Sequence, residues 1–234
     1  MALIDGADAC GLLTRNYSLR MEKLMLRVCF ALFFLNATTF AQAPAAAAAT
    51  KNVVFLGDSL SAGLGVKPNE SFPSLIEDKI RAAGLPYQVE NAGLSGDTTA
   101  GGLRRIDWLL QRKIDVLVIE LGGNDGLRGL PVNAVKANLQ AIIDKVKAKE
   151  PDAKIVIAGM QIPPNLGPDY AAEFQRVYGE LAQKNNAALI PFLLEGVGGM
   201  RDLNQPDMIH PTAAGHRKVA EVVWRTLEPL LRHG

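Results

Sequence analysis

The sequence predicts an α/β domain of three layers, in which helices cover both faces of a parallel sheet of about five strands. Short apolar runs alternate along the chain with longer segments of helical periodicity. Strands that alternate with helices form parallel sheets covered on both sides. The chain has 234 residues, 48% of them hydrophobic, which suits one packed domain better than two.

Five short apolar runs are predicted as strands. Because crossovers between parallel strands are right-handed, the carboxyl ends of these strands are expected at one edge of the sheet, where sites of this architecture form. The run with the strongest strand character reads DVLVIEL. The predicted strands are residues 52–56, 87–90, 115–121, 154–160 and 188–192.

Five longer segments are predicted as helices from apolar residues at helical spacing. Asp97 or Thr98 is a plausible N-cap for the second of them. The predicted helices are residues 71–83, 98–110, 132–149, 169–185 and 212–231.

Residues 1–50 are predicted to be a signal region and residues 51–234 the folded domain. A short basic segment from Met21, an apolar run over 28–40 and Ala-rich sequence follow in the order of a secretory signal. We expect translation to start at Met21, cleavage within residues 43–50, and a periplasmic or secreted protein. The alternative is a membrane anchor, but an apolar run of 13 residues is short of the ~20 that a spanning helix needs.

Composition excludes several kinds of site. Both cysteines, Cys10 and Cys29, precede residue 51, so the domain has no thiol nucleophile, disulfide or zinc-thiolate site. The formal net charge is +1, and this balance argues against nucleic acid as a partner.

Four polar segments carry the candidate chemistry. Three follow predicted strands: GDSLS at 57–61, NAGLSGD at 91–97 and LGGNDG at 121–126. The fourth, DMIHP at 207–211, precedes the last helix. A serine hydroxyl needs an adjacent base to become a nucleophile, so a histidine partner is required for Ser59.

His210 is the best candidate for that base. His233 is one residue from the end of the chain, and His216 lies within the last predicted helix. Asp207, three residues before His210, can orient the imidazole as the acid of a triad does. The Gly-x-Ser-x-Gly turn of α/β-hydrolases is absent because residue 61 is Ser, and that fold is therefore rejected.

Together the four segments resemble the four blocks of the SGNH (GDSL) hydrolase superfamily, and within it the bacterial periplasmic thioesterase I, arylesterase and lysophospholipase group. The resemblance covers residues 52 to about 231 and fits a flavodoxin-like form of the three-layer fold. It implies that Ser59 is the nucleophile. It also implies that the oxyanion is held by the backbone N–H groups of Ser59 and Gly93 and by the side-chain amide of Asn124.

The expected reaction is two-step acyl transfer to water through an acyl-enzyme on Ser59. The substrate would be a small-molecule ester or thioester, such as an acyl-CoA, an aryl ester or a lysophospholipid. We expect no metal, no cofactor and a monomer. The acyl group is predicted to contact Leu127, Leu130, Ile162 and Leu166, although these side chains could instead only cap the core.

Other interpretations remain open at this point. Ser59 and Gly93 could be turn residues, Asn124 a loop cap and Asp207 a helix cap. The same motifs could serve a carbohydrate O-acetyl esterase, or a non-catalytic lipid-binding protein that keeps the fold.

A metal site of Asp207, His210 and His216 is disfavoured because there is no HExxH pattern and no cysteine. Residues 96–102 resemble a P-loop only faintly, since the lysine is missing. The basic cluster Arg104, Arg105, Arg112 and Lys113 is interpreted as a solvated face, with docking of an anionic group as the alternative. Asp58, Asp97 and Asp125 are interpreted as hydrogen-bonding turn residues.

Overall fold

The structure, a computed structural model, describes residues 50–233. It contains one sheet of five parallel strands in the order β2-β1-β3-β4-β5, which is the flavodoxin-like order. The predicted fold class is confirmed. The predicted signal region lies outside the described residues. The strands are β1 (Lys51–Gly57), β2 (Tyr87–Gly93), β3 (Val116–Glu120), β4 (Lys154–Ala158) and β5 (Ala188–Ile190).

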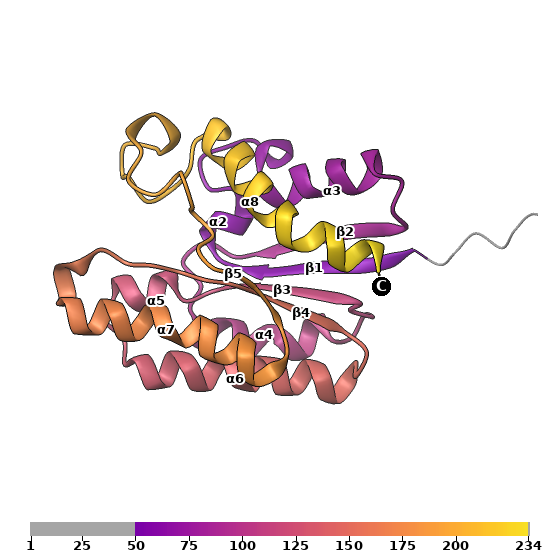
Figure 1. Ribbon diagram of the computed structural model, residues 1–234, viewed down its shortest axis with the longest axis horizontal. Coiled ribbons are helices and arrows are strands. Elements are labelled where there is room, and N and C mark those ends of the chain that lie inside the picture. Colours follow the sequence, from indigo (N-terminus) through magenta and orange to yellow (C-terminus); the bar gives the residue numbers. More distant parts are fainter. Residues whose placement is uncertain (1–49, 234) are drawn as a thin grey trace, which may run out of the picture. The chain divides into compact units, whose positions relative to one another are not determined.

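Helices cover both faces of the sheet (Figure 1). Helices α3 and α8 pack on one face, and α4, α6 and α7 on the other. No helix between residues 50 and 233 is both long and apolar enough to span a bilayer. The helices are α2 (Ser59–Ala62), α3 (Phe72–Ala82), α4 (Thr99–Leu109), α5 (Gly123–Leu127), α6 (Val132–Lys149), α7 (Pro168–Asn185) and α8 (Ala213–Arg232). The 3₁₀ helices are η1 (Pro68–Glu70), η2 (Pro164–Leu166) and η3 (Arg201–Leu203).

The core lies on either side of the two central strands. Every residue of β3 is buried, as are Val53 to Gly57 of β1. Both strands read as continuous apolar runs rather than alternating ones, because helices cover both of their faces. The apolar positions of α6 that repeat at helical spacing are also buried.

Two short helices, α2 and α5, lie where the sequence predicts loops. Asp58 caps α2, since its Oδ1 accepts a hydrogen bond from Leu60 N–H at 3.0 Å, and Gly63 ends it with a φ of 74°. Gly122 precedes α5 with a φ of 113°, and a Cβ there would collide with the Tyr178 hydroxyl. Four or five residues are too few to show helical periodicity, so pattern analysis does not detect them.

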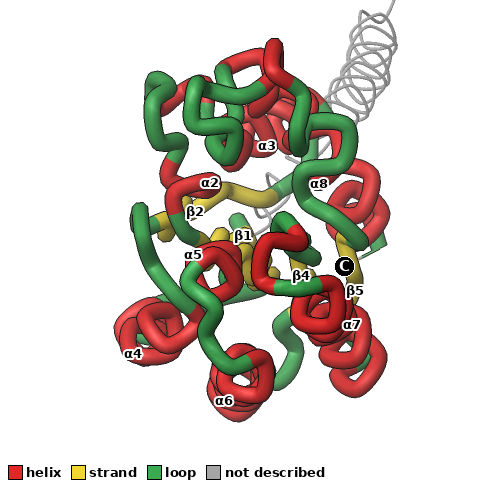
Figure 2. The backbone as a smooth tube through the Cα atoms, turned by 90° about the vertical axis from the view of Figure 1, so that its left-hand side faces the viewer, coloured by secondary structure: helices red, strands yellow, loops and turns green. Residues whose placement is uncertain are grey.

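Strand ends also differ from the prediction. β2 continues to Gly93, because residues 91–93 pair in register with residues 55–57 of β1. β5 ends at Ile190, two residues early. The sheet order reverses at β1, and the crevice at the carboxyl ends of β1 and β3 is therefore the expected place for a site. Figure 2 views the domain from this edge.

Candidate active site

Ser59 is the first residue of α2, directly above the end of β1. The turn from Gly57 through Asp58 into α2 places its side chain at the carboxyl edge of the sheet, where it is mostly buried. The Oγ atom of Ser59 lies 2.8 Å from Nε2 of His210, although the two residues are 151 positions apart. The predicted nucleophile and base are thus within hydrogen-bonding distance.

The other nitrogen of His210 faces Asp207. Nδ1 lies 2.7 Å from Oδ2 of Asp207, while Oδ1 accepts hydrogen bonds from the backbone N–H groups of Ile209 (3.1 Å) and His210 (3.0 Å). This turn fixes both side chains relative to the backbone. Burial acts to raise the pKa of Asp207, but the hydrogen bonds from His210 and Ile209 together lower it below its ordinary value. Asp207 is thereby kept ionised beside the imidazole.

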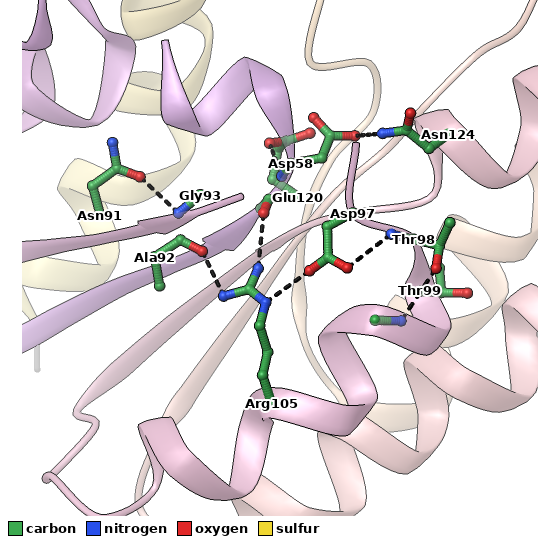
Figure 3. A network of polar contacts seen from close by, with 12 residues as sticks. Asp58, Asn91, Ala92, Gly93, Asp97, Thr98, Thr99, Arg105, Glu120 and Asn124 are labelled. Carbon is green, nitrogen blue, oxygen red and sulfur yellow. Dashed lines mark hydrogen bonds and ion pairs between the residues drawn. The ribbon is translucent and has the colours of Figure 1, made fainter. Parts of the chain in front are cut away.

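Two predicted oxyanion donors are available. Ser59 is in the first turn of a helix, whose N–H groups have no intrahelical acceptor, and no described group accepts from its N–H. Asn124, at the start of α5, donates through Nδ2 to Oδ2 of Asp58 at 3.1 Å (Figure 3). An amide nitrogen carries two protons, so this contact orients Asn124 and leaves one proton for a ligand.

The third predicted donor, Gly93, is not free. Its N–H donates to Oδ1 of Asn91 at 3.0 Å (Figure 3). Gly96 lies three residues further along the same loop, with a φ of 81°, and within residues 50–233 its N–H has no acceptor. The N–H of Gly93 is therefore already engaged, whereas the N–H groups of Ser95 and Gly96 in the same loop have no acceptor within residues 50–233. The two glycines are equally permissive in sequence, so only the hydrogen bonding separates them.

A carboxyl group that the sequence reasoning missed lies beneath Ser59. Glu120, the last residue of β3, is 0% exposed. Its Oε2 accepts hydrogen bonds from Asp58 N–H (3.1 Å), Ser61 N–H (3.1 Å) and Ser61 Oγ (2.7 Å). The signal in the sequence is an acidic residue between apolar neighbours near the end of the run DVLVIEL, whereas the other acidic residue, Asp115, begins the run.

Arg105 corrects another expectation. It does not belong to a solvated face, because its guanidinium pairs with Asp97 at 2.7 Å and donates to the carbonyl oxygens of Ala92 (2.7 Å) and Gly57 (2.9 Å) (Figure 3). Arg105 thus ties the end of β2 to the end of β1. Asp97 is its ion-pair partner, in addition to accepting a turn hydrogen bond from Thr98 N–H.

A cavity of about 190 Å³ opens beside the Ser59 and His210 side chains. Of the four predicted acyl contacts, Leu127 and Ile162 line it, whereas Leu130 and Leu166 do not. Further apolar residues that sequence reasoning did not select line the cavity from the segments after β4 and β5, and two of them lie inside the DMIHP segment. These are Met160, Phe192, Leu194, Met208 and Ile209.

His216 is turned away from this site. It is 1% exposed, its ring stacks on Phe72, and its Nδ1 accepts a hydrogen bond from Phe72 N–H at 3.2 Å. Burial, and secondarily the charge of His210, lowers the pKa of His216 to about 4. His216 therefore packs α8 against α3, and it does not join Asp207 and His210 as a metal ligand.

Several known proteins match this chain over most of its length. The GDSL-like Lipase/Acylhydrolase family matches residues 55–218. Esterase TesA of Pseudomonas aeruginosa is 42% identical over 212 residues, covering 90% of this chain and all of that protein. Thioesterase 1/protease 1/lysophospholipase L1 of Escherichia coli K12 is 36% identical over 188 residues, covering 80% and 88%.

The fold agrees as well. A crystal structure of TesA superposes with a TM-score of 0.74 at 44% identity, covering 77% of this chain and 99% of that one. The sequence match spans most of the chain, includes the Ser59 turn and the His210 loop, and is accompanied by the same fold. The chain therefore belongs to the GDSL-like lipase/acylhydrolase family, the SGNH hydrolases that its four motifs resemble.

Proposed function

We propose that the protein hydrolyses acyl esters and thioesters through an acyl-enzyme on Ser59. The observation that carries the proposal is the chain of contacts from Ser59 Oγ to His210 (2.8 Å) and from His210 to Asp207 (2.7 Å). His210 takes the Ser59 proton as Oγ attacks the acyl carbonyl, and then gives that proton to the leaving alcohol or thiol. Water, activated by His210, releases the acid and regenerates Ser59.

Charge on the attacked oxygen would be met by N–H donors. We assign this role to the N–H of Ser59, the free amide proton of Asn124 and the N–H of Gly96 in place of Gly93. Such donors act most strongly when they are fixed before the reaction begins. A crystal structure of the phosphonylated enzyme would test the assignment: the phosphonyl oxygen should lie within about 3 Å of the nitrogen of Gly96, and contact with Gly93 instead would contradict it.

The substrate class follows from the cavity. Its lining is mostly apolar, with Leu127, Ile162 and Phe192 among its walls, which suits an acyl chain better than a sugar. Esters and thioesters differ mainly in the leaving atom, and the triad chemistry serves both. The names of the relatives, esterase and thioesterase, fit this range.

The decisive experiment combines labelling with turnover. A fluorophosphonate should label the wild type at Ser59 and not label Ser59→Ala. The labelled protein should lose hydrolysis of nitrophenyl esters and acyl-CoAs of graded chain length, while EDTA leaves the wild-type rate unchanged. A folded wild type that neither labels nor turns over would instead be a lipid-binding protein, and the proposal would be wrong.

Export is proposed from the order of the N-terminal segments from Met21 to Thr50. Protein recovered from the periplasm or medium should begin between Ala43 and Asn52 when its N-terminus is sequenced. Soluble exported protein that still begins at Met21 would contradict cleavage.

A further inference from the structure

The buried carboxyl group of Glu120 holds both flanks of the nucleophile. Its Oε2 atom accepts from the N–H of Asp58, the residue before Ser59, and from both the N–H and the hydroxyl of Ser61, the second residue after it. One side-chain oxygen at the end of β3 thus accepts all three hydrogen bonds from the first turn of α2 and its N-cap residue. Ser59 itself makes no bond to Glu120, so its hydroxyl and N–H remain directed at the cavity and His210.

The identity of neighbouring residues follows from this contact. A Cβ at position 57 would collide with Ser61 Oγ and with Oε2 of Glu120, so Gly57 is required wherever that pair is present. Ser61, whose presence argued against an α/β-hydrolase turn, supplies the shortest of the three hydrogen bonds, at 2.7 Å. The side chain of Glu120 therefore accounts for both Gly57 and Ser61 of the GDSLS segment, although these lie 63 and 59 positions before it.

The surroundings of Glu120 favour its neutral form. Its Oε1 atom is buried and has no partner among residues 50–233, and an orphaned oxygen is far more costly when it carries charge. Burial first, and then the nearby carboxyl of Asp58, raises the pKa of Glu120 well above its ordinary value. The other groups that face it offer little compensation: Arg105 is committed to Asp97 and two carbonyls, and Tyr178 donates to Leu121.

We propose that Glu120 is a positioning residue for acyl transfer, acting as a neutral carboxylic acid that fixes the α2 turn beneath Ser59. The inference rests on the proposed function, because its readouts are steps of that reaction. A neutral acceptor can hold the N–H groups of Asp58 and Ser61 without adding a negative charge under the place where the oxyanion forms. An ionised carboxylate would hold them more tightly, but its charge would oppose that oxyanion.

The test compares a neutral isostere with a truncation. Glu120→Gln keeps an oxygen acceptor and no charge, so its kcat should stay close to wild type. Glu120→Ala leaves the turn unsupported. Since a shift of about 1 Å at a reacting group can cost roughly 10²-fold, we expect a fall in kcat of that order with little change in KM. Fluorophosphonate labelling of Ser59 should slow in the same ratio.

Tyr178→Phe is the matched control. It removes another fully buried polar group, one that donates to the carbonyl of Leu121 next to Glu120, but it touches nothing on the α2 turn. Thermal unfolding should report a loss of stability in Tyr178→Phe with kcat preserved. A merely structural role for Glu120 predicts the same behaviour for Glu120→Ala, and that result would overturn the proposal.

Two further outcomes complete the test. A Glu120→Gln variant that folds and still loses as much turnover as we expect for Glu120→Ala would show that the charge of Glu120 is needed, and the neutral-acid role would be wrong. If Glu120→Ala does not fold, Ser61→Ala takes its place, because it removes the shortest of the three hydrogen bonds to Glu120: a fall in kcat supports the positioning role, and a wild-type kcat with lowered stability contradicts it. All rates are ratios to a wild type that labels at Ser59, so a wild type that fails to label contradicts the proposed function and not the role of Glu120.

Discussion

The two sides of Ser59 are built differently. On the loop side, Asp207 and His210 come from a single turn before α8, and the Asp207 side chain is 45% exposed. On the sheet side, Glu120 at the end of β3 is fully buried, and Asp58 nearly so. Hydrogen bonds lower the pKa of Asp207, whereas burial raises the pKa values of both Glu120 and Asp58.

The difference matches what each side has to do. In the proposed reaction, the loop side moves a proton and must stabilise a positive imidazolium, for which an ionised carboxylate at 2.7 Å from His210 is suited. In the same proposal, the sheet side faces a developing negative charge, for which fixed N–H donors and neutral supports are suited. The same residue type, a carboxylic acid, therefore serves opposite electrostatic purposes depending on its exposure.

The largest loss of kcat should come from removing either of the two reacting side chains, Ser59 and His210. Ser59→Ala or His210→Ala should lower kcat by up to ~10⁶-fold, and the double variant should be little worse than either, because the two groups act as one unit. Single-turnover kinetics on folded protein, checked by circular dichroism, measure this. Additive losses in the double variant would mean that the two residues work independently.

Removing only the orienting carboxylate should cost less. Asp207→Asn keeps the shape of the turn but cannot hold His210 in the required tautomer, and the loss of kcat can reach ~10⁴-fold. Because Asp207 is partly exposed, water can replace some of its effect and the loss should fall below that limit. Turnover equal to wild type would show that the 2.7 Å contact only caps the turn.

On the sheet side, Asn124→Ala removes one oxyanion donor. The expected loss is about 10²–10³-fold, and it should appear in kcat rather than KM because the donor meets a charge that exists only in the transition state. Steady-state kinetics on a short nitrophenyl ester separate the two parameters. A change confined to KM would make Asn124 a ground-state contact.

The cavity wall should affect substrate preference more than rate. Ile162→Ala removes an apolar contact from the lining and should reduce kcat/KM for long acyl esters relative to acetyl esters by about tenfold, as expected for lost methylene contacts. Leu166→Ala, outside the lining, is the control and should leave this ratio unchanged. The opposite pattern would place the acyl chain over η2.

The smallest effect on turnover is expected from His216, which belongs to neither side. Its pKa of about 4 in the folded protein lies below the ~6.5 of an unfolded chain. Only the unfolded state gains the proton between these values, so stability is full above about pH 6.5 and falls as pH drops towards 4, by roughly 3 kcal/mol at most.

The variant His216→Asn should flatten this part of the stability curve, measured by denaturant unfolding at each pH, while kcat at neutral pH stays near wild type. His233→Asn, at the exposed end of α8, should leave the curve as it is. An unchanged slope in His216→Asn would assign the acid sensitivity to other groups.

Sequence alone determined the features that depend on neighbours along the chain. The periodicity of residues 132–149 predicted α6 at its observed ends, and the short spacing of Asp207 and His210 predicted their contact. Alternating strands and helices predicted the parallel sheet, and the sheet placed the motif segments at one edge. These patterns are local, and the rules of sheet topology then leave few arrangements.

Only the tertiary structure decided the contacts that join distant segments. It engaged the N–H of Gly93 with Asn91 and left that of Gly96 without an acceptor among residues 50–233. It directed the guanidinium of Arg105 to the ends of two strands. It also separated the leucines that line the cavity from those that do not. Above all, it placed Glu120 next to the turn that carries Ser59. The sequence of a strand does not show what an acidic residue in it will contact, because that depends on which backbone the packed sheet brings close to it.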